Sequence, residues 1–306
     1  MHDFDAPQPT LLLADGMAIV RRCYKAQSGE DTPARAKGAL EAAHKSIMRA
    51  LREHEPTHFL VPFDHGGKTF RHRLYEHYKA HREPMPDVLS EALPAFFEQL
   101  QASGICTARI PDVEADDVIG SVATNAVSRG YKVIVTLSDK DMFRLIDEGV
   151  VVYDHWESQE RDRAFVMRKF GVEPSQMTDF LALMGDSTDG IPGVKAIGEK
   201  KAAALLQQYK TLDAALEASS SMQGQVGVAL RNGREDALLS RELVRLKLDV
   251  KVGIKPSQMQ LPAALVALIA EMPEPKHVRV TRTGKQAAQV LSERQLRPPA
   301  TPRMTT

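Results

Sequence analysis

Nine acidic residues are placed where their carboxylates can act together as ligands of metal ions. They are Asp15, Asp64, Glu114, Asp116, Asp117, Asp139, Asp141, Asp186 and Asp189. Taken one at a time, most have an ordinary structural explanation, because acids favour the first turn of a helix and aspartate is common in turns. As a set they follow predicted strands or begin predicted helices, so we expect them to face one edge of a sheet.

Carboxylates gathered at one edge repel one another strongly unless cations occupy the space between them. Hard oxygen ligands select Mg²⁺ or Mn²⁺, which keep several waters and accept phosphate oxygens as further ligands. Two such ions about 4 Å apart can generate hydroxide, orient a phosphodiester and stabilise its leaving oxygen. No set of histidines and cysteines in the sequence has the spacing of a zinc site. The acids therefore predict a metal-dependent phosphodiesterase.

Three apolar runs that each end in one of these aspartates predict the strands that position them. The runs are 10–16 (TLLLADG), 58–64 (HFLVPFD) and 131–139 (YKVIVTLSD). Two shorter runs, 104–110 and 149–154, predict a fourth and a fifth strand. Helical periodicity follows the strands, and this alternation is typical of an α/β fold with a mostly parallel sheet flanked by helices. Because the carboxyl ends of parallel strands meet at one edge, Asp15, Asp64 and Asp139 should converge there.

Amphipathic helices are predicted between the strands and through the second half of the chain. Apolar residues recur at helical spacing over 40–51 and 89–100. After the fifth predicted strand the remaining segments are helical. We therefore expect an α/β domain over 10–163, a helical portion over 164–252, and a C-terminal extension over 253–306 that is partly disordered.

The bulk composition is that of a globular protein in a reducing compartment. A hydrophobic content of 43% over 306 residues argues against a disordered chain. Cys23 and Cys106 lack metal spacing and predict free thiols. The first ten residues lack the features of a secretory signal, and the longest apolar stretch, 261–272, is far short of the roughly 20 residues that a membrane helix needs. We expect a cytoplasmic protein with no membrane partner.

The formal net charge is zero, with 40 basic and 40 acidic residues. A nucleic-acid partner normally calls for a basic surface, because its phosphates are negative. If nine of the 40 acids hold metal, 31 acids remain against 40 bases. The surface outside the metal site is then net positive, which is compatible with nucleic-acid binding.

Five ordered motifs resemble those of the 5′ nuclease, or flap endonuclease, family, which includes the N-terminal nuclease domain of bacterial DNA polymerase I and free-standing phage 5′ exonucleases. The matching segments are LLLADG (11–16), FDHGGKTFRHRLYEHYKAHREPMP (63–86), VEADDVIG (113–120), SDKDMFRL (138–145) and DFLALMGDSTDGIPGVKAIGEKKAAALL (179–206). The resemblance covers roughly residues 10 to 250. It implies a PIN-like sheet domain with a helical arch, and a helical portion with a helix–three-turn–helix DNA-binding element.

The resemblance also implies two Mg²⁺ or Mn²⁺ ions and divides the acids between them. Nearest the first ion it places Asp64, Glu114, Asp116 and Asp139, with Asp15 and Asp141 around it. On the side of the second ion it places Asp117, Asp186 and Asp189. Some relatives lack second-site acids, so the presence of Asp186 and Asp189 favours a catalytically competent enzyme over a binding-only relative.

Three residues of YKAHR, Tyr78, Lys79 and Arg82, match the base of the arch, through which a 5′ single strand passes in the family. Lys79 and Arg82 would neutralise charge that develops on the scissile phosphate, and Tyr78 would stack on a base. Arg71 and Arg73 are further expected phosphate contacts. The alternative explanation of this segment is a solvated basic helix face.

The segment GVKAIGEKKA resembles the hairpin of the helix–three-turn–helix element. Gly193 and Gly198 allow tight turns, so that backbone amides near a helix N-terminus approach a phosphate closely. Three lysines would add charge attraction without reading sequence, namely Lys195, Lys200 and Lys201. In the family this element grips the duplex backbone, often with a monovalent cation such as K⁺ on main-chain carbonyls. The alternative is two glycines that merely end a helix.

Residues and resemblance together predict a monomeric nuclease that acts on DNA with 5′ ends or flaps during replication or repair. The expected products are a 5′-phosphate and a 3′-hydroxyl, and RNA primers are among the implied substrates. Two alternatives stay open at this point. One is a PIN-type ribonuclease, and the other is a protein that binds branched DNA without cutting it.

Overall fold

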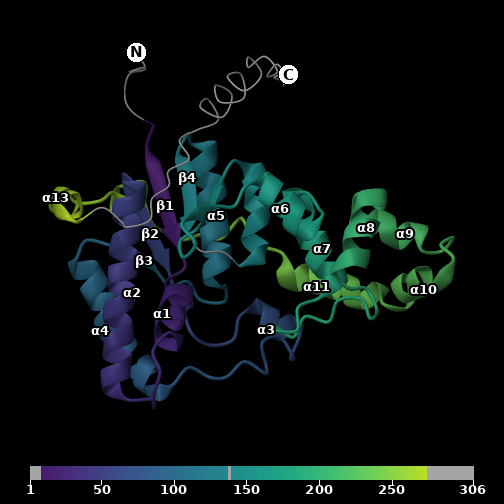
Figure 1. Ribbon diagram of the computed structural model, residues 1–306, viewed down its shortest axis with the longest axis horizontal. Helices are drawn as coiled ribbons and strands as arrows, with labels where there is room; N and C mark the ends of the chain where they lie inside the picture. The colour runs from purple at the N-terminus through teal and green to yellow at the C-terminus, as the bar shows by residue number, and fades with distance from the viewer. Residues whose placement is uncertain (1–7, 137–138, 274–306) are drawn as a thin grey trace, which may run out of the picture. The chain divides into compact units, whose positions relative to one another are not determined.

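The computed structural model describes residues 8–136 and 139–273, and it contains a six-stranded sheet. The strands are β1 (Thr10–Ala14), β2 (His58–Pro62), β3 (Cys106–Ala108), β4 (Lys132–Thr136), β5 (Val151–Asp154) and β6 (Gln159–Glu160). Their order is β3-β2-β1-β4-β5-β6, with β1 to β5 parallel and β6 antiparallel to β5. Figure 1 shows strands β1 to β4 of this sheet. The five strands predicted from the sequence and their parallel arrangement are confirmed, and β6 is an addition.

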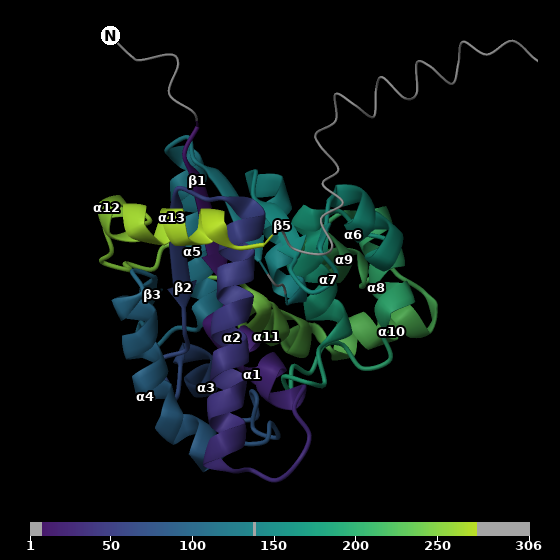
Figure 2. The ribbon, with the colours of Figure 1, turned by 60° about the vertical axis from the view of Figure 1, so that its left-hand side comes forward.

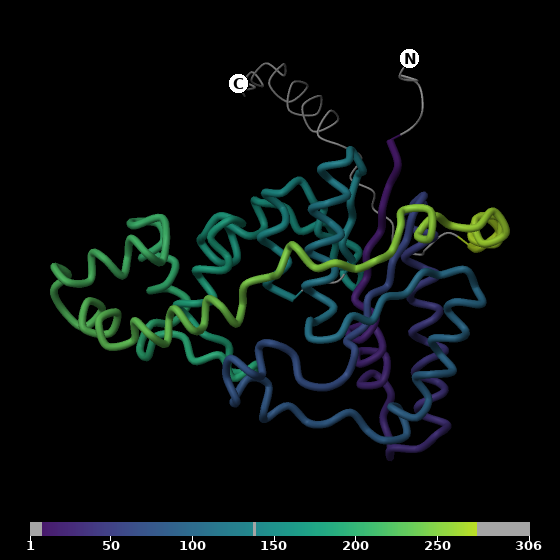
Figure 3. Tube along the Cα trace, turned by 180° about the vertical axis from the view of Figure 1, so that it is seen from behind, coloured from purple at the N-terminus to yellow at the C-terminus, as the bar shows by residue number. Residues whose placement is uncertain are grey.

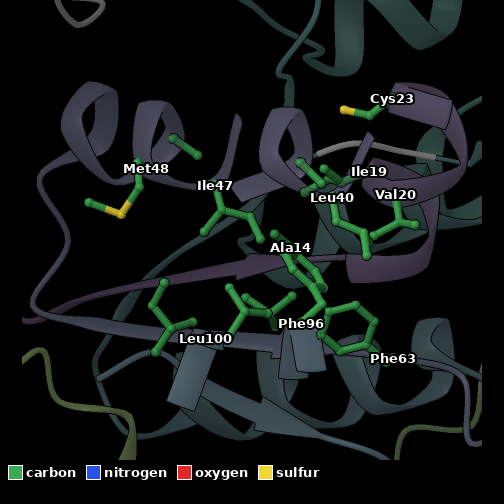
Figure 4. Close-up of a cluster of buried hydrophobic side chains, with 14 of the residues drawn as sticks. Ala14, Ile19, Val20, Cys23, Leu40, Ile47, Met48, Phe63, Phe96 and Leu100 are labelled. Atoms are coloured by element: carbon green, nitrogen blue, oxygen red, sulfur yellow. The ribbon is translucent and has the colours of Figure 1, made fainter. Parts of the chain in front are cut away.

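Helices cover both faces of the sheet, which explains why the central strands are apolar without alternation. From β1, Leu12 and Ala14 point into one core and Leu11 and Leu13 into another. The first core lies under α1 (Gly16–Lys25), α2 (Pro33–His54) and α4 (Asp87–Ala102). Figure 4 shows how side chains from these helices meet there, among them Ile19, Leu40, Ile47 and Phe96. The second core lies under α5 (Ala115–Ser128).

The segment expected to form a helical arch is less helical than the resemblance implies. Between β2 and α4 it contains one helix, α3 (Phe70–Leu74), followed by turns to about residue 82 and an irregular stretch to Pro86. Pro84 and Pro86 explain why the stretch before α4 is irregular, because proline lacks an N–H and disfavours helical geometry in the residue before it. The segment still spans the acidic edge of the sheet, as described below.

A second group of helices has its own apolar core. Its elements are η1 (Lys140–Glu148), α6 (Arg163–Phe170), η2 (Pro174–Gln176), α7 (Met177–Met184), α8 (Glu199–Tyr209), α9 (Leu212–Ala218), α10 (Gly224–Asn232) and α11 (Arg234–Val244). Phe180 and Leu206 are fully buried in this core. The helical character predicted after the fifth strand is confirmed.

The chain then returns from α11 to the sheet, as the trace in Figure 3 shows. Ser121 of α5 receives this segment: its hydroxyl donates to the carbonyl of Lys247 and accepts from the N–H of Val250. Two short helices follow, α12 (Pro256–Met259) and α13 (Ala263–Glu271), and α13 lies against α2 (Figure 2). Part of the expected C-terminal extension is therefore packed on the α/β portion.

The disorder expected at the end of this extension falls in 274–306, outside the described residues. Within the described ranges, no helix combines the length and the apolar character needed to cross a membrane. The boundaries proposed at 163/164 and 252/253 remain predictions, since contact between the α/β and helical portions makes residues 8–273 part of one compact unit.

A buried histidine joins α2 to the turn after β5. His155 is 1% exposed, its Nε2 lies 2.9 Å from the hydroxyl of Ser46, and its carbonyl accepts a hydrogen bond from Arg49. Burial, with the nearby positive charge of Arg49 and His54, lowers the pKa of His155 to about 3. A histidine in the unfolded chain has a pKa of about 6.5. Between about pH 3 and about pH 6.5 it is therefore protonated in the unfolded chain but neutral in the folded protein.

This difference predicts that acid destabilises the fold through His155. The free energy of unfolding should fall below pH 6.5, by up to about 2 kcal/mol from this group at pH 5. His155→Gln lacks this titrating group. The difference in the free energy of unfolding between His155→Gln and the unmodified protein should therefore be smaller at pH 5 than at pH 7.5. Urea unfolding at both pH values measures it, with the exposed His81→Gln as a control. If the free energy of unfolding depended equally on pH in His155→Gln and in the unmodified protein, His155 would not titrate as stated.

Candidate active site

Three parallel strands deliver aspartates to the same edge of the sheet. Asp15 directly follows β1 and caps α1, where its Oδ1 accepts a hydrogen bond of 2.9 Å from the N–H of Ala18. Asp64 follows β2, and its Oδ1 accepts a hydrogen bond of 2.9 Å from the N–H of Ala115 at the start of α5. Asp139 follows β4 and caps η1. Their placement agrees with the convergence predicted from the strand ends.

The sharp entry from β1 into α1 depends on Gly16. A Cβ at this position would lie 2.3 Å from ring carbons of Phe63, which is closer than real Cβ contacts come. Phe63 immediately precedes Asp64, so the ring that packs over Gly16 also fixes the chain at the end of β2. This packing explains why a glycine follows the aspartate of the first strand.

Three more acids stand at the start of α5. Glu114 is the N-cap, and Asp116 and Asp117 occupy the first turn, where negative charge favours the positive end of the helix dipole. The N–H of Glu114 donates to Oδ2 of Asp117 over 3.1 Å. The helix-start explanation of this motif is thus correct, and it holds together with a position at the acidic edge.

The acids at this edge lie close enough to perturb one another. Burial, followed by the charge of Asp64, raises the pKa of Asp15 to about 7. Burial raises the pKa of Asp116 well above its usual value, and Asp15, Asp139 and Asp141 raise it further. Asp141 is shifted in the same direction by burial and by Asp139. Negative charge is therefore concentrated here beyond what the surrounding side chains offset.

The donor set at this edge fits a divalent cation such as Mg²⁺ or Mn²⁺. All the donor atoms are carboxylate oxygens, which these ions prefer, and a cation would offset the mutual repulsion that raises the pKa values. Across 8–136 and 139–273, no three Asp, Glu, His or Cys side chains are already gathered tightly enough to hold a metal ion.

Glu114 differs from its neighbours because two cations face it. Lys79 Nζ lies 2.8 Å from Oε1 of Glu114, and Arg71 lies 3.4 Å from Oε2. Burial alone would raise the pKa of Glu114, but these two charges lower it below its usual value. The hydroxyl of Tyr78 also donates to Oε2 over 3.0 Å. Lys79 therefore stands at the acidic edge, where the arch resemblance predicts it.

Tyr78 itself is buried, which corrects the expectation that it stacks on a base. Its side chain is 3% exposed and packs within the core of the helical portion, with its ring against His72. A ring enclosed in this way has no free face for a nucleotide. Its role in this structure is to hold Glu114.

Arg71 is buried as well, which corrects the expectation of a phosphate contact. Its guanidinium is 3% exposed and donates two hydrogen bonds, of 2.6 and 2.8 Å, to the carboxylate of Asp117, whose side chain is fully buried. It also donates to the carbonyls of Leu243 and Arg245 at the C-terminal end of α11. Both oxygens of Asp117 are thus occupied by Arg71, so Asp117 is a structural anchor in this structure rather than a free metal ligand.

Arg73, on the same helix, remains at the surface. Its side chain is 60% exposed and pairs with Asp112, which is 46% exposed, over 2.6 Å. An exposed pair of this kind is weak and exchanges readily for another anion. Its position is compatible with the expected phosphate contact.

The loop 185–191 brings the last two acids to the site from the helical portion. Arg82 pairs with Oδ1 of Asp189, and the N–H of Lys79 donates to the carbonyl of Asp189 over 2.8 Å. This second contact holds Lys79 in the left-handed region, at φ 54°. A Cβ on Gly190 would lie 2.5 Å from the carbonyl of His77, so glycine is required where the two segments touch.

Asp186 has a cationic partner that the sequence motifs did not single out. Lys140 Nζ lies 2.5 Å from Oδ2 of Asp186, and its backbone N–H donates to Asp139 over 2.7 Å. Lys140 and Asp186 each stabilise the charged form of the other. Burial would raise the pKa of Asp186, but Lys140 lowers it, and burial would lower the pKa of Lys140, but Asp186 raises it. The available signal was the position of Lys140 between Asp139 and Asp141.

The expected DNA-binding hairpin lies between α7 and α8. Gly193 adopts φ 61°, and a Cβ there would lie 2.4 Å from the backbone nitrogen of Gly185, so two chain segments cross at these glycines. Gly198 differs from expectation: it is extended and caps α8, with nothing within 4 Å of an added Cβ. The backbone there is open to a ligand. The three expected lysines, Lys195, Lys200 and Lys201, are all exposed.

Family models for two consecutive domains match this chain. Residues 10–171 match the 5′-3′ exonuclease N-terminal resolvase-like domain, and residues 172–265 match the 5′-3′ exonuclease C-terminal SAM fold. These matches meet at 171/172, directly after α6, whereas the boundary proposed from the sequence lies at 163/164. Together they extend across the α/β portion and the hairpin to the first turn of α13.

Curated relatives are similar over most of the chain. A flap endonuclease Xni of Shewanella sediminis is 36% identical over 253 residues, which is 83% of this chain and 98% of the relative. A second, from Psychromonas ingrahamii, is 33% identical over 80% of this chain and 94% of the relative. DNA polymerase I of Mycobacterium tuberculosis is 34% identical over 84% of this chain, but only 29% of the polymerase is covered.

Solved structures share the fold at lower sequence identity. The T5 D15 protein co-crystallised with metal ions has a TM-score of 0.64 and 20% identity, over 86% of this chain and 98% of that one. The catalytic core of Rad2 in complex with a DNA substrate has a TM-score of 0.54 and 14% identity, over 93% and 92%. At these identities the likeness concerns the fold alone.

The buried pair between Arg71 and Asp117 generates a stability prediction. Arg71→Met should lower the free energy of unfolding by about 3–5 kcal/mol, because it leaves the Asp117 carboxylate buried without a partner. Arg73→Met, two residues away on the same helix, removes only an exposed pair and should cost less than about 1 kcal/mol. Chemical denaturation measures both.

If Arg71→Met kept normal stability and instead weakened DNA binding, Arg71 would be the phosphate contact that the sequence suggested. Equal losses of stability in the two variants would likewise contradict the structural role assigned to Arg71.

Proposed function

The chain belongs to the 5′-3′ exonuclease family, and we propose that it hydrolyses phosphodiester bonds at 5′ ends or flaps of DNA during replication or repair. The observation that carries this proposal is the acidic edge of the sheet with Lys79 and Arg82 beside it. Carboxylates that repel one another, next to partly exposed cationic side chains, suit a substrate that is both metal-bound and anionic.

We propose that two Mg²⁺ or Mn²⁺ ions bind at this edge. The carboxylates available to the first are Asp15, Asp64, Glu114, Asp116, Asp139 and Asp141, and those on the side of the second are Asp186 and Asp189. Asp117 is left out because its side chain is fully buried and Arg71 occupies both of its oxygens. When bound, such ions supply Lewis acidity to the phosphodiester and lower the pKa of a coordinated water.

The proposed role of Lys79 and Arg82 is to hold the scissile phosphate. Lys79 is 18% exposed and Arg82 36% exposed, and each has a carboxylate partner in Glu114 or Asp189. A phosphate can replace these partners once the carboxylates are engaged by metal. The two cations then stabilise negative charge on the phosphate in a partly dehydrated site, where such interactions are strong.

The proposed duplex contact is the hairpin between α7 and α8. The open backbone at Gly198 and the exposed Lys195, Lys200 and Lys201 would bind phosphates without reading bases. A K⁺ ion on main-chain carbonyls of this hairpin is part of the proposal. The carbonyl of Ala196 already accepts a hydrogen bond of 2.7 Å from Lys201 Nζ, so it faces positive charge.

Family membership favours this function over the two alternatives drawn from the sequence. Relatives named flap endonuclease or 5′-3′ exonuclease, and the match to the SAM-fold domain, support a DNA nuclease rather than a PIN-type ribonuclease. The retained acids favour an enzyme over a protein that only binds branched DNA. We further propose that the protein is a cytoplasmic monomer and that RNA primers are additional substrates.

Removal of one carboxylate tests the catalytic proposal. Asp116→Ala should reduce Mg²⁺-dependent cleavage of a labelled 5′ flap to background, because the substitution removes a metal ligand. Binding of the flap should stay measurable, because the hairpin lysines, Lys79 and Arg82 are unchanged. Glu91→Ala, an exposed acid on α4, is the control and should cleave normally.

A second experiment compares substrates. The unmodified protein is incubated with Mg²⁺ or Mn²⁺ and, in parallel, a flap, a nicked duplex, an overhang or a single-stranded RNA. Flap binding by the unmodified protein without any cleavage would favour the binding-only alternative. Preferential cleavage of the single-stranded RNA would favour the ribonuclease.

The hairpin lysines generate a separate prediction about affinity. Replacing Lys195, Lys200 and Lys201 together by Gln should weaken duplex binding at low salt. The slope of log affinity against log salt concentration should become shallower by about two to three, because each lost phosphate contact removes roughly 0.9. The matched control replaces the exposed Lys25, Lys37 and Lys45 of α1 and α2. An unchanged slope in the hairpin variant would place the duplex elsewhere.

A further inference from the structure

Lys140 places its ammonium between two sets of proposed metal ligands, as Lys79 does between Glu114 and Asp189. It stands between Asp139 and Asp141 in the sequence, at the first position of η1. Its side chain crosses to the loop 185–191 and ends 2.5 Å from Oδ2 of Asp186. The β4 side of the site and the loop from the helical portion are thus joined by this ion pair.

This ammonium has more acidic neighbours than an ordinary surface lysine. Besides Asp186, it lies within electrostatic range of Asp139 and Asp141. The Lys140 side chain is 35% exposed and that of Asp186 is 17% exposed, so the pair is only partly screened by water. A charge in this position acts on the carboxylates much as a bound monovalent cation would.

Asp186 has little freedom to serve two cations at once. Its Oδ1 accepts a hydrogen bond of 2.8 Å from the N–H of Thr188, and its backbone pairs with Ile191 on the other side of the loop. The other oxygen, Oδ2, is the one that Lys140 holds. A metal ion that takes Asp186 as a ligand must therefore displace the ammonium or accept its repulsion.

We propose that Lys140 is a built-in competitor for the second metal ion, and that it sets the affinity of the site for that ion. The inference rests on the proposed metal-dependent function. The lysine side chain is flexible, so it can leave Asp186 without any change in the backbone. While it stays, it offsets the charge of Asp186 and disfavours a second divalent ion. The first ion, on the acids near β1, β2 and α5, is affected less.

Metal binding without DNA tests this directly. Mn²⁺ is titrated into the unmodified protein, Lys140→Met, Asp186→Asn and the double variant, with calorimetry and paramagnetic resonance of free Mn²⁺ as readouts. Lys140→Met should bind the weaker Mn²⁺ about tenfold more tightly or better, which corresponds to about 1.4 kcal/mol. Asp186→Asn should lose the weaker ion, and adding Lys140→Met to it should change nothing.

Lys132→Met is the matched control, because it makes the same change at the exposed opposite end of β4. It should bind both ions as the unmodified protein does, and circular dichroism confirms that each variant is folded. An unchanged weaker affinity in Lys140→Met would overturn the proposal, leaving an ordinary surface ion pair. A weakened affinity would overturn it in the other direction, since Lys140 would then hold Asp186 in place for the metal.

These outcomes are distinct from failure of the proposed function itself. If the unmodified protein bound no Mn²⁺ at all, the metal site would be wrong and not merely the role of Lys140. If it bound one ion and Lys140→Met bound two, the competition would be shown in its strongest form. If neither bound a second ion, Lys140 would not be the competitor.

Discussion

The ion pair between Arg71 and Asp117 is the interaction on which the arrangement of the site depends. Arg71 belongs to the segment that crosses the acidic edge, and Asp117 to the helix that supplies Glu114 and Asp116. The carbonyls that complete the guanidinium's hydrogen bonds lie at the end of α11. Asp117 also accepts from the N–H of Lys247, where the chain returns to the sheet. Because a charge buried without a partner is very costly, none of these three segments can move away alone.

Around this pair, the site balances a concentration of negative charge that the fold itself imposes. Parallel strands must end at the same edge, and acids at those ends are brought together whether or not their charges are compensated. Glu114, Asp186 and Asp189 have cationic partners in Lys79, Lys140 and Arg82, while Asp15, Asp116 and Asp141 hold protons more tightly than usual. Pairing with a cation and a raised pKa both reduce the repulsion between these acids. Only pairing with a cation places positive side chains where a phosphate can bind them.

Glycines decide where the helical portion can approach the sheet domain. Gly190 allows the loop after α7 to touch the segment that carries Lys79, and the crossing of Gly185 with Gly193 closes that loop tightly. The loop's two acids therefore reach the acidic edge, although they lie more than forty residues beyond the other acids in the sequence. Gly198 serves a different end, since it leaves the start of α8 uncovered for a ligand.

The sequence by itself determined the five parallel strands, the acids at their ends and the helical second half, because periodicity and strand-end position are local properties of the chain. It did not determine which charged groups pair. Arg71 and Tyr78 match a DNA-binding motif, yet the structure buries both, and Lys140 was given no role within its motif although it faces Asp186. The exposure of a side chain and the identity of its partner depend on segments that meet only after folding, such as α11 against Arg71. Tertiary structure alone therefore decided which cations anchor the fold and which remain beside the acids.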